Sequence, residues 1–258
     1  MQLATKVLRK KARPEIRDRP MTVVEHLEDL RRVLIICFGA WAVGTAIAFI
    51  FNGWLLGVLL HPLTLTLAKN KHSIVQTAIF TAPTEGLTVP IKIASIAGLI
   101  LALPVVLWQI WTFVSPALQP AERKFALPFV ASSLLLFAAG AAFAYFVMPL
   151  GLNFLASFLN GNAVYFPDIN QYLSFLLLLI LIFGVTFELP IAIILLGLLR
   201  IVSSQKLRAH RKAIWVGIIF AALIVTPGAD PFTPTALAIP LLILFEVSVL
   251  VLAKALNR

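Results

Sequence analysis

Residues 172–199 read YLSFLLLLILIFGVTFELPIAIILLGLL, an apolar run of 28 residues in which Glu188 is the single Asp, Glu, Lys or Arg. A helix needs about 20 predominantly apolar residues to cross the hydrocarbon core of a bilayer, so this run is long enough to span it. Pro190 follows the acid two residues later, which places a helix breaker and a charge together inside lipid. The run therefore predicts a transmembrane helix with an unusual polar site.

Five further apolar runs surround this one, and all are expected to be helices. They are Val33–Phe51, Ile93–Val114, Phe125–Met148, Ala213–Val225 and Ala236–Ala253. Pro104 should kink the second of these runs, and Pro149 should end the third. The run 213–225 is too short to cross a core of about 30 Å upright, so it is a short span in thinned bilayer or an arm of a re-entrant hairpin; we favour two short spans. The sequence predicts an all-α, polytopic membrane protein with six transmembrane helices, the last two of them short.

The composition supports a membrane protein over a soluble one. Of the 258 residues, 60% are hydrophobic and 12% are charged, and the mean hydropathy is +0.98. A soluble domain carries about twice that charged fraction, and disordered chains are poor in apolar residues. The one cysteine, Cys37, excludes a disulfide framework and a CxxC site.

The placement of the basic residues predicts the orientation. Of the 21 Lys and Arg residues, 18 lie before Val33, in the 115–124 loop, in the 200–212 loop and at the C-terminus. The loops on the opposite side hold only Lys69 and Lys71, with Lys92 at a helix edge. Because cytoplasmic loops are rich in Lys and Arg, both termini should be cytoplasmic. These loop charges orient the protein in the membrane and do not suggest nucleic acid as a partner.

Three parts are expected along the chain. Residues 1–21 form a basic cytoplasmic tail, residues 22–254 a single transmembrane domain, and residues 255–258 a cytoplasmic C-terminal tail. Thr22-Val23-Val24-Glu25 matches a capping box, so an amphipathic entry helix should begin there.

Two acids, Glu188 and Glu246, lie inside the predicted spans, where a charge costs roughly 2.5–3.5 kcal/mol. Pro190 cannot bond the carbonyl of Thr186, so these two residues and Glu188 are expected to form one polar notch. Glu246 lies two turns before Lys254, and it is either a wetted acid near the cytoplasmic face or a second functional acid.

Further acids occur in the cytoplasmic segments, at Glu25, Glu28, Asp29 and Glu122. One interpretation is local pairing, such as Glu28 with Arg31 or Arg32. The other is that acids from two segments converge on a cationic ligand, in which a guanidinium is held by bidentate hydrogen bonds.

Enzymatic motifs are missing from the sequence. The four histidines are scattered without ligand spacing, and HExxH, GxSxG and Walker A patterns do not occur. We therefore expect no catalytic residues, no metal site and no cofactor.

His26-Leu27-Glu28-Asp29-Leu30-Arg31 resembles the H-L-x-E-L-R motif of the TatC family, the core subunits of twin-arginine protein translocases. The family acid falls on Asp29, a conservative departure from glutamate. The further matches are, in order, Leu60-His61-Pro62-Leu63; Pro104-Val105-Val106-Leu107-Trp108-Gln109-Ile110-Trp111 with Phe113; Ser115-Pro116-Ala117-Leu118; Glu122-Arg123; Phe187-Glu188-Leu189-Pro190; and Thr226-Pro227 with Asp230. The resemblance covers about residues 22–254.

The resemblance implies a receptor in the cytoplasmic membrane for signal peptides with adjacent arginines. With single-span Tat subunits (TatA/TatB type), and in a larger complex that holds several copies, it would move folded proteins across the membrane using the proton-motive force. The residues implied for signal-peptide binding are Glu28, Asp29, Arg31, Phe113, Glu122 and Arg123. Glu188, with Thr186 and Pro190, is implied in partner contact, and Pro62, Pro104, Asp230 and Glu246 are further positions of interest. Pro234 stands where many relatives carry glutamine, which removes a polar side chain there.

The alternative is a proton- or cation-coupled secondary transporter of a small solute, with Glu188 as the proton carrier. It accounts for the acid within the span, but it leaves the cytoplasmic acids unexplained. Many such transporters contain an internal repeat, which this sequence does not show. An intramembrane hydrolase would need a paired aspartate, a serine or a metal site within the spans.

Overall fold

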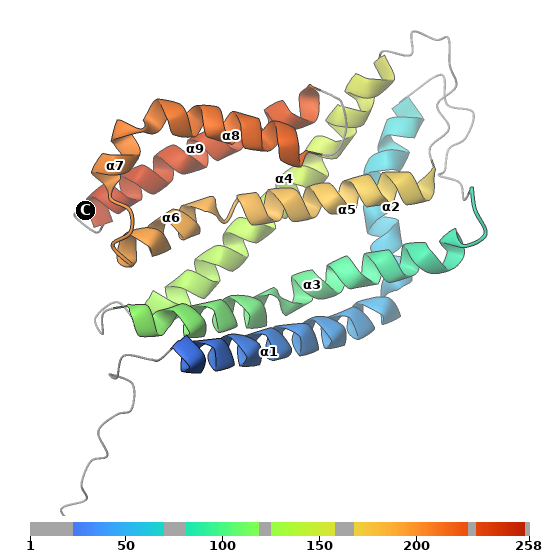
Figure 1. The fold of residues 1–258 in the computed structure, drawn as a ribbon. Coiled ribbons are helices and arrows are strands. Elements are labelled where there is room, and N and C mark those ends of the chain that lie inside the picture. The colour runs from blue at the N-terminus through green and yellow to red at the C-terminus, as the bar shows by residue number, and fades with distance from the viewer. Residues whose placement is uncertain (1–22, 70–80, 119–124, 158–167, 227–230, 256–258) are drawn as a thin grey trace, which may run out of the picture.

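The computed structural model describes residues 23–69, 81–118, 125–157, 168–226 and 231–255, and every regular element in them is helical. The elements are α1 (Val23–Ile50), α2 (Asn52–Lys69), α3 (Glu85–Val114), the 3₁₀ helix η2 (Ser115–Ala117), α4 (Ala126–Ser157), α5 (Ile169–Thr186), α6 (Leu189–Leu198), α7 (Ser204–Ala209), α8 (Arg211–Val225) and α9 (Phe232–Ala255) (Figure 1). Five segments of the described chain are long and apolar enough to cross a membrane. The prediction of an all-α, multi-pass membrane protein is confirmed, and its six crossings correspond to α1, α3, α4, α5 with α6, α8 and α9.

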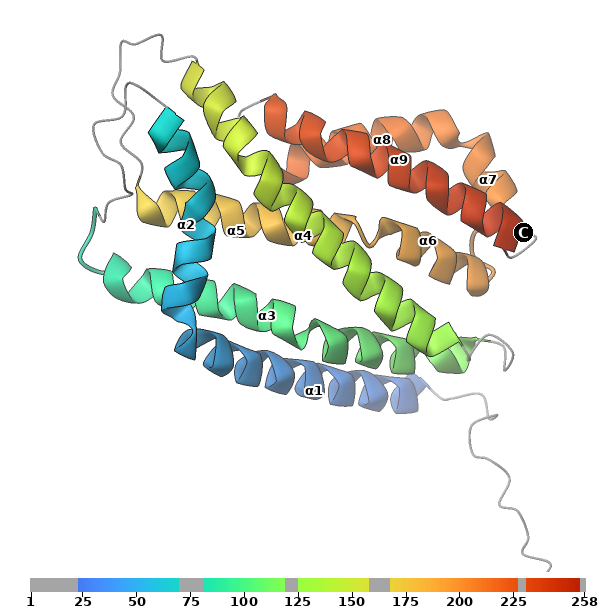
Figure 2. The ribbon, with the colours of Figure 1, turned by 180° about the vertical axis from the view of Figure 1, so that it is seen from behind.

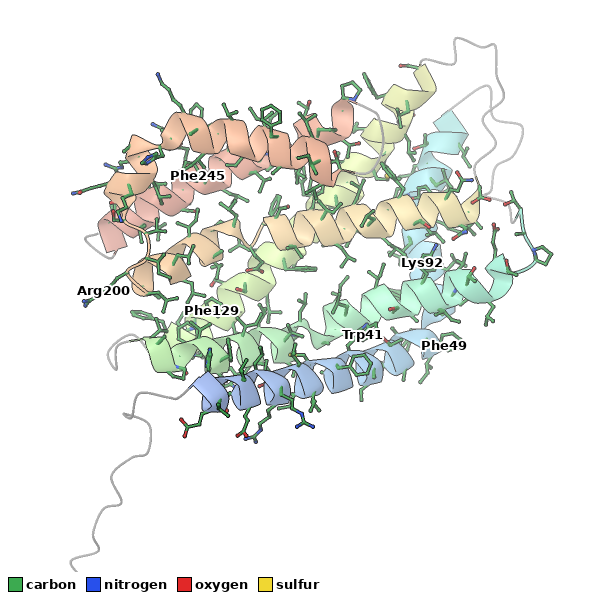
Figure 3. All side chains as sticks on the ribbon, viewed as in Figure 1. Trp41, Phe49, Lys92, Phe129, Arg200 and Phe245 are labelled. Carbon is green, nitrogen blue, oxygen red and sulfur yellow. The ribbon has the colours of Figure 1, made fainter. Side chains whose placement is uncertain are left out.

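The helices α1 and α3 lie side by side in both views of the ribbon (Figures 1 and 2). A Cβ atom added to Gly44 would lie 2.5 Å from the carbonyl oxygen of Gly98, so the two backbones approach closely because both residues are glycine. The indole of Trp41, labelled in Figure 3, donates to the carbonyl of Ser95 at 2.9 Å. The entry segment and the first span form this one continuous helix, which fixes the start of α1 beside the end of α3.

The helix α2 is an element that the sequence analysis did not predict, because it treated this region as a loop. Pro62 lies in its middle and is buried, and its ring supplies no N–H for the carbonyl of Val58. The Tyr145 hydroxyl of α4 donates to that carbonyl at 2.8 Å, and the Tyr172 hydroxyl of α5 donates to the carbonyl of Leu59 at 2.9 Å. The proline therefore frees an acceptor that ties α2 to α4, and the second tyrosine bond ties α2 to α5.

Prolines are tolerated inside three of the long helices, α3, α4 and α9, the last of which contains Pro240. Pro104 lies within α3, which continues to Val114. Pro149 lies within α4, so the prediction that it ends the third span is wrong. Met148 and Leu152, on either side of this proline, are buried, and this packing holds the helix together across the missing hydrogen bond.

The fourth predicted span is two helices, α5 and α6, separated by Phe187 and Glu188. The Glu188 N–H bonds the carbonyl of Val185, three residues back, and the regular pattern resumes where Ala192 N–H bonds the carbonyl of Glu188 at 2.9 Å. Pro190 occupies the first turn of α6, a position where a missing N–H costs nothing. The acid therefore lies at a break in the span.

The last two spans differ in length. α8 has 15 residues and is short, as predicted, but α9 has 24 residues and is long enough to cross a membrane. The last span is the shortest of the five candidate spans, but it begins before the predicted run 236–253. The helix α9 starts at Phe232, because Pro234 lies in the opening turn, where proline is accepted.

The start of α1, the end of α3, the start of α4, α7 and the end of α9 gather at one end of the molecule (Figures 1 and 2). Arg200, labelled in Figure 3, lies at this end, as do Arg208 of α7 and Lys254 of α9. We call it the basic end. The main core lies between α2, α4, α5 and α9, and its most deeply buried residues include Leu63, Leu173, Leu176, Phe183, Leu237 and Phe245.

Candidate functional site

Glu28, Asp29 and Arg31 lie in the first turns of α1, at the basic end. All three side chains are exposed. Within the described parts of the chain, neither acid forms an ion pair. The local pairing of Glu28 with Arg31 or Arg32 is thus not the arrangement found there, and both carboxylates remain open to a ligand.

Asp29 lines a cavity of about 280 Å³ between α1 and α3. The other lining residues are Arg32, Val33 and Ile36 from α1, and Trp108, Gln109, Thr112 and Phe113 from α3. Asp29, Val33 and Ile36 share one helix face because they are spaced by four and three residues. Glu28 and Arg31 do not line this cavity. The structure therefore brings Asp29 and Phe113 together and separates them from the other two predicted residues of α1.

A ring contact closes one side of this site. The His26 imidazole stacks on the Phe113 ring, with 4.3 Å between the centroids and 18° between the planes. No role was predicted for His26 from the sequence, although it is the first residue of the H-L-x-E-L-R motif. Arg32 and Gln109 are also cavity residues that the analysis did not assign, and only the motif could have indicated Gln109.

Glu122, Arg123 and Asp230 lie outside the described residues. The convergence of Glu122 with Asp29 on one ligand therefore stays a prediction.

Glu188 is half-buried at the break between α5 and α6. Its Oε1 atom is buried, and within the described chain it has no hydrogen-bond partner. The Ser133 hydroxyl of α4 faces this carboxyl group but does not reach hydrogen-bonding geometry. An acid in a span with an unsatisfied oxygen is a place where a polar group of another helix could bind.

The other two residues of the predicted notch differ from Glu188. The Thr186 hydroxyl donates to the carbonyl of Ile182 at 2.7 Å, within its own helix. Pro190 is buried. A joint role of Glu188, Thr186 and Pro190 in partner contact stays a prediction.

Glu246 has an internal partner that the sequence did not indicate. Arg211, at the start of α8, contacts it through Nε at 2.6 Å and through Nη2 at 2.5 Å, and the Trp215 indole N–H donates to it at 2.9 Å. The guanidinium also lies 5.0 Å from the centroid of the Trp215 ring. Glu246 therefore clamps α8 to α9, which supports a structural role.

A second polar cluster lies at the opposite end of the molecule. The Thr81 hydroxyl contacts both Asp168 and Glu85, and Asp168 caps α5 by accepting from the Gln171 N–H at 2.7 Å. These donors, the Thr81 hydroxyl first, hold the pKa of Asp168 below its usual value. Lys92 donates to Asn170 and Ser174 at 2.6 Å each, so this lysine is satisfied by α5. Across the described residues, no group of three or more His, Cys, Asp or Glu side chains could hold a metal ion.

Comparisons with known proteins agree with this architecture. Residues 25–240 match the family model of the Sec-independent protein translocase protein TatC. The chain is 40% identical over 237 residues to the Sec-independent protein translocase protein TatC of Carboxydothermus hydrogenoformans, covering 91% of this chain and 93% of that protein. It is 37% identical to the Escherichia coli K12 protein of the same name, over 88% of this chain and 86% of that one.

A solved structure shares both fold and sequence with the chain. A crystal structure of the twin-arginine translocase receptor TatC superposes with a TM-score of 0.76 at 37% identity, covering 91% of this chain and all of that one. The similarity thus extends over nearly the whole helical domain.

Proposed function

The chain belongs to the TatC family of Sec-independent protein translocase proteins, and from that premise we propose that it is a receptor for twin-arginine signal peptides. With single-span subunits of the TatA/TatB type, and in a complex that holds several copies, it moves folded proteins across the cytoplasmic membrane. The proton-motive force drives this movement. Family membership gives no support to the alternative, a secondary transporter of a small solute.

The observation that carries this proposal is Asp29, an exposed acid without an ion-pair partner in the described chain that lines a cavity beside Phe113. A guanidinium offers planar, bidentate hydrogen bonds to a carboxylate and can stack on an aromatic ring. Both surfaces are present in this cavity. Glu122 and Arg123, outside the described residues, are assigned to the same site by their place in the motif, and Glu122 would meet the second arginine.

The test is peptide binding by the purified full-length protein. A twin-arginine signal peptide should bind, and its twin-lysine analogue should bind at least about tenfold more weakly, because an ammonium cannot make the bidentate contact. Equal affinity for the two peptides would show that the site does not recognise a guanidinium specifically. Solute uptake into proteoliposomes without any peptide would instead support a transporter.

Glu188 is proposed as the contact for a partner helix within the membrane. Its unsatisfied Oε1 supports this role, because a polar group of a neighbouring helix would complete its hydrogen bonding. Glu188→Gln keeps a polar amide and should preserve crosslinking from this face to a single-span partner, whereas Glu188→Ala should weaken it. Twin-arginine peptide binding should be the same in both variants. Crosslinking of equal strength in wild type and Glu188→Ala would make the break purely structural.

The basic end is proposed to face the cytoplasm, which the positive-inside bias supports. In a Cys37→Ala background, cysteines at Ser157 and Gln205 probe the two ends, since both side chains are exposed. An impermeant thiol reagent added to intact cells should label Ser157→Cys and leave Gln205→Cys unlabelled. The opposite pattern would reverse the orientation and remove the signal-peptide site from the cytoplasm.

A further inference from the structure

A second cavity at the basic end, of about 490 Å³, lies between α7, the start of α8 and α9, away from the cavity of Asp29. Its polar lining is Arg208, Arg211 and Glu246, and α9 contributes an apolar wall of Phe245, Val249 and Leu250. The role of the chain in protein translocation assigns no function to this cavity.

The cavity carries a net positive charge. Glu246 uses the Nε and Nη2 atoms of Arg211, so it neutralises one of the two arginines and leaves three of the five guanidinium N–H donors of Arg211 unused in the described chain. Arg208 is exposed and has no partner among the described residues. One uncompensated positive charge with several free donors suits a singly charged phosphodiester.

The surrounding sequence strengthens this positive field. From Leu189 to Arg258 the chain holds seven Lys and Arg residues and two acids, Asp230 and Glu246. Asp230 lies outside the described residues, and Glu246 is the acid of this stretch among the residues that the structure describes. Anions near this end therefore meet an excess of cations.

The apolar wall distinguishes a lipid from a free anion. On α9, Ile239, Ile243 and Val247 are 56%, 60% and 46% exposed. With Leu250 of the cavity lining they follow one face of the helix, at spacings of four, four and three residues. These side chains continue the cavity wall along the surface of a helix long enough to cross the membrane. A free phosphate would gain nothing from this strip, whereas an acyl chain attached to a bound headgroup would cover it.

We infer that this cavity binds an anionic phospholipid, with its phosphodiester held by Arg208 and Arg211 and an acyl chain along α9. The inference does not depend on the signal-peptide site, because it uses different helices and the opposite charge. Bound lipid would contact both α8 and α9 beside the clamp formed by Arg211 and Glu246.

The test uses purified full-length protein in neutral detergent, titrated with phosphatidylglycerol or with phosphatidylcholine of the same chain length. Native mass spectrometry counts the lipids retained. Phosphatidylglycerol should be retained in preference, and Arg208→Gln should weaken it ~5-fold, the effect of one cation near a lipid headgroup. Arg200→Gln is the matched control, because Arg200 lies at the same end but does not line the cavity, and it should leave retention unchanged.

Several outcomes would overturn the inference. Equal losses in Arg208→Gln and Arg200→Gln would reduce the site to a general surface charge. Equal retention of phosphatidylcholine would show that the site does not select for negative charge. Displacement of the lipid by millimolar inorganic phosphate would assign the site to a free anion. Displacement by an acidic peptide would assign it to a protein partner. If Arg208→Gln does not fold, Leu250→Trp provides the test, since it fills the cavity at unchanged charge and should also lower retention.

Discussion

Asp29 and Glu246 are both acids at the basic end of the molecule, but their surroundings are opposite. Glu246 receives three donor contacts, two from Arg211 and one from Trp215. Asp29 forms no ion pair within the described chain and lines a cavity between two helices. The first acid joins helices that are adjacent in sequence, and the second is open at the junction of α1 and α3.

The difference shows how to separate structural acids from binding acids at a membrane boundary. A carboxylate whose charge and lone pairs are matched inside the protein has little left to offer an external cation. A carboxylate without such partners keeps its full attraction for one, and a guanidinium is the cation that fits it best. The first three predictions therefore each alter one of these surroundings and leave the other intact.

The largest effect is expected from Asp29→Asn, which keeps the shape of the side chain and removes its charge. Twin-arginine peptide affinity should fall ~30-fold, or about 2 kcal/mol, because a partly desolvated charge pair is lost. Fluorescence titration of labelled peptide with purified protein measures this. Glu28→Gln is the matched control, since Glu28 is the neighbouring acid and does not line the cavity. A fall of the same size in both variants would mean that general acidity, and not this cavity, attracts the peptide.

The second prediction disturbs the packing of α1 on α3, which forms the cavity of Asp29, and leaves the pair of Arg211 and Glu246 unchanged. Gly98→Ala places a Cβ atom 2.5 Å from the Thr45 hydroxyl oxygen, so α1 and α3 must separate. We expect a loss of about 1–2 kcal/mol in unfolding free energy, together with weaker peptide binding. Gly39→Ala, in the same helix pair, meets nothing within 4 Å and should be neutral or stabilising by up to about 1 kcal/mol. Equal thermal stability of the two variants would show that the helices do not depend on this close approach.

The third prediction concerns the strength of the ion pair between Glu246 and Arg211. Its pair with Arg211 is partly exposed, at 28% for the glutamate and 51% for the arginine, so solvent screens the interaction. A double-mutant cycle of Glu246→Gln and Arg211→Gln should therefore give a coupling energy below about 1 kcal/mol, decreasing with salt. Peptide binding should not change. A loss of peptide affinity in Glu246→Gln would place this acid among the binding residues after all.

Much of the fold follows from the sequence because lipid imposes simple rules. Apolar length identified the long spans, and the acid and Pro190 indicated a polar site at Glu188, but the division of that span into α5 and α6 was not predicted. The helix α2 was not predicted from the sequence, because it contains Pro62 and a proline inside a helix usually breaks it. The tyrosine that satisfies the freed carbonyl of Val58 comes from α4, and a second tyrosine, from α5, bonds the carbonyl of Leu59. Pairing between distant segments is not encoded in local periodicity.

The same limit applies to the candidate site. The motif indicated Asp29 and Phe113, but which acid of the Glu28-Asp29 pair faces the cavity depends on how α1 packs on α3. The partner of Glu246 is 35 residues away in sequence. Several arginines were equally plausible from the sequence, so only the packing of α8 on α9 identifies Arg211.

The smallest expected effect concerns Asp168, an acid of a third kind, which is matched by uncharged donors. The Thr81 hydroxyl and the Gln171 N–H hold its pKa below the usual value. The ionised carboxylate therefore stabilises the folded protein at neutral pH. That contribution is lost as the pH falls from about 5 through the lowered pKa, because the unfolded chain binds the proton first. Thr81→Val removes the main donor, so the variant should be less stable than wild type near neutral pH and indistinguishable from it in strong acid.

Thermal unfolding in detergent, followed from about pH 7 to about pH 2, measures this difference. Thr81→Ser keeps a hydroxyl and should behave like wild type. Because the same hydroxyl also lies 3.0 Å from Glu85, the comparison is repeated in an Asp168→Asn background, where the effect of Thr81→Val should no longer depend on pH. A pH dependence that survives in that background would assign the effect to Glu85. Added salt should matter less here than at Glu246, since the donors around Asp168 are mainly neutral and short-range.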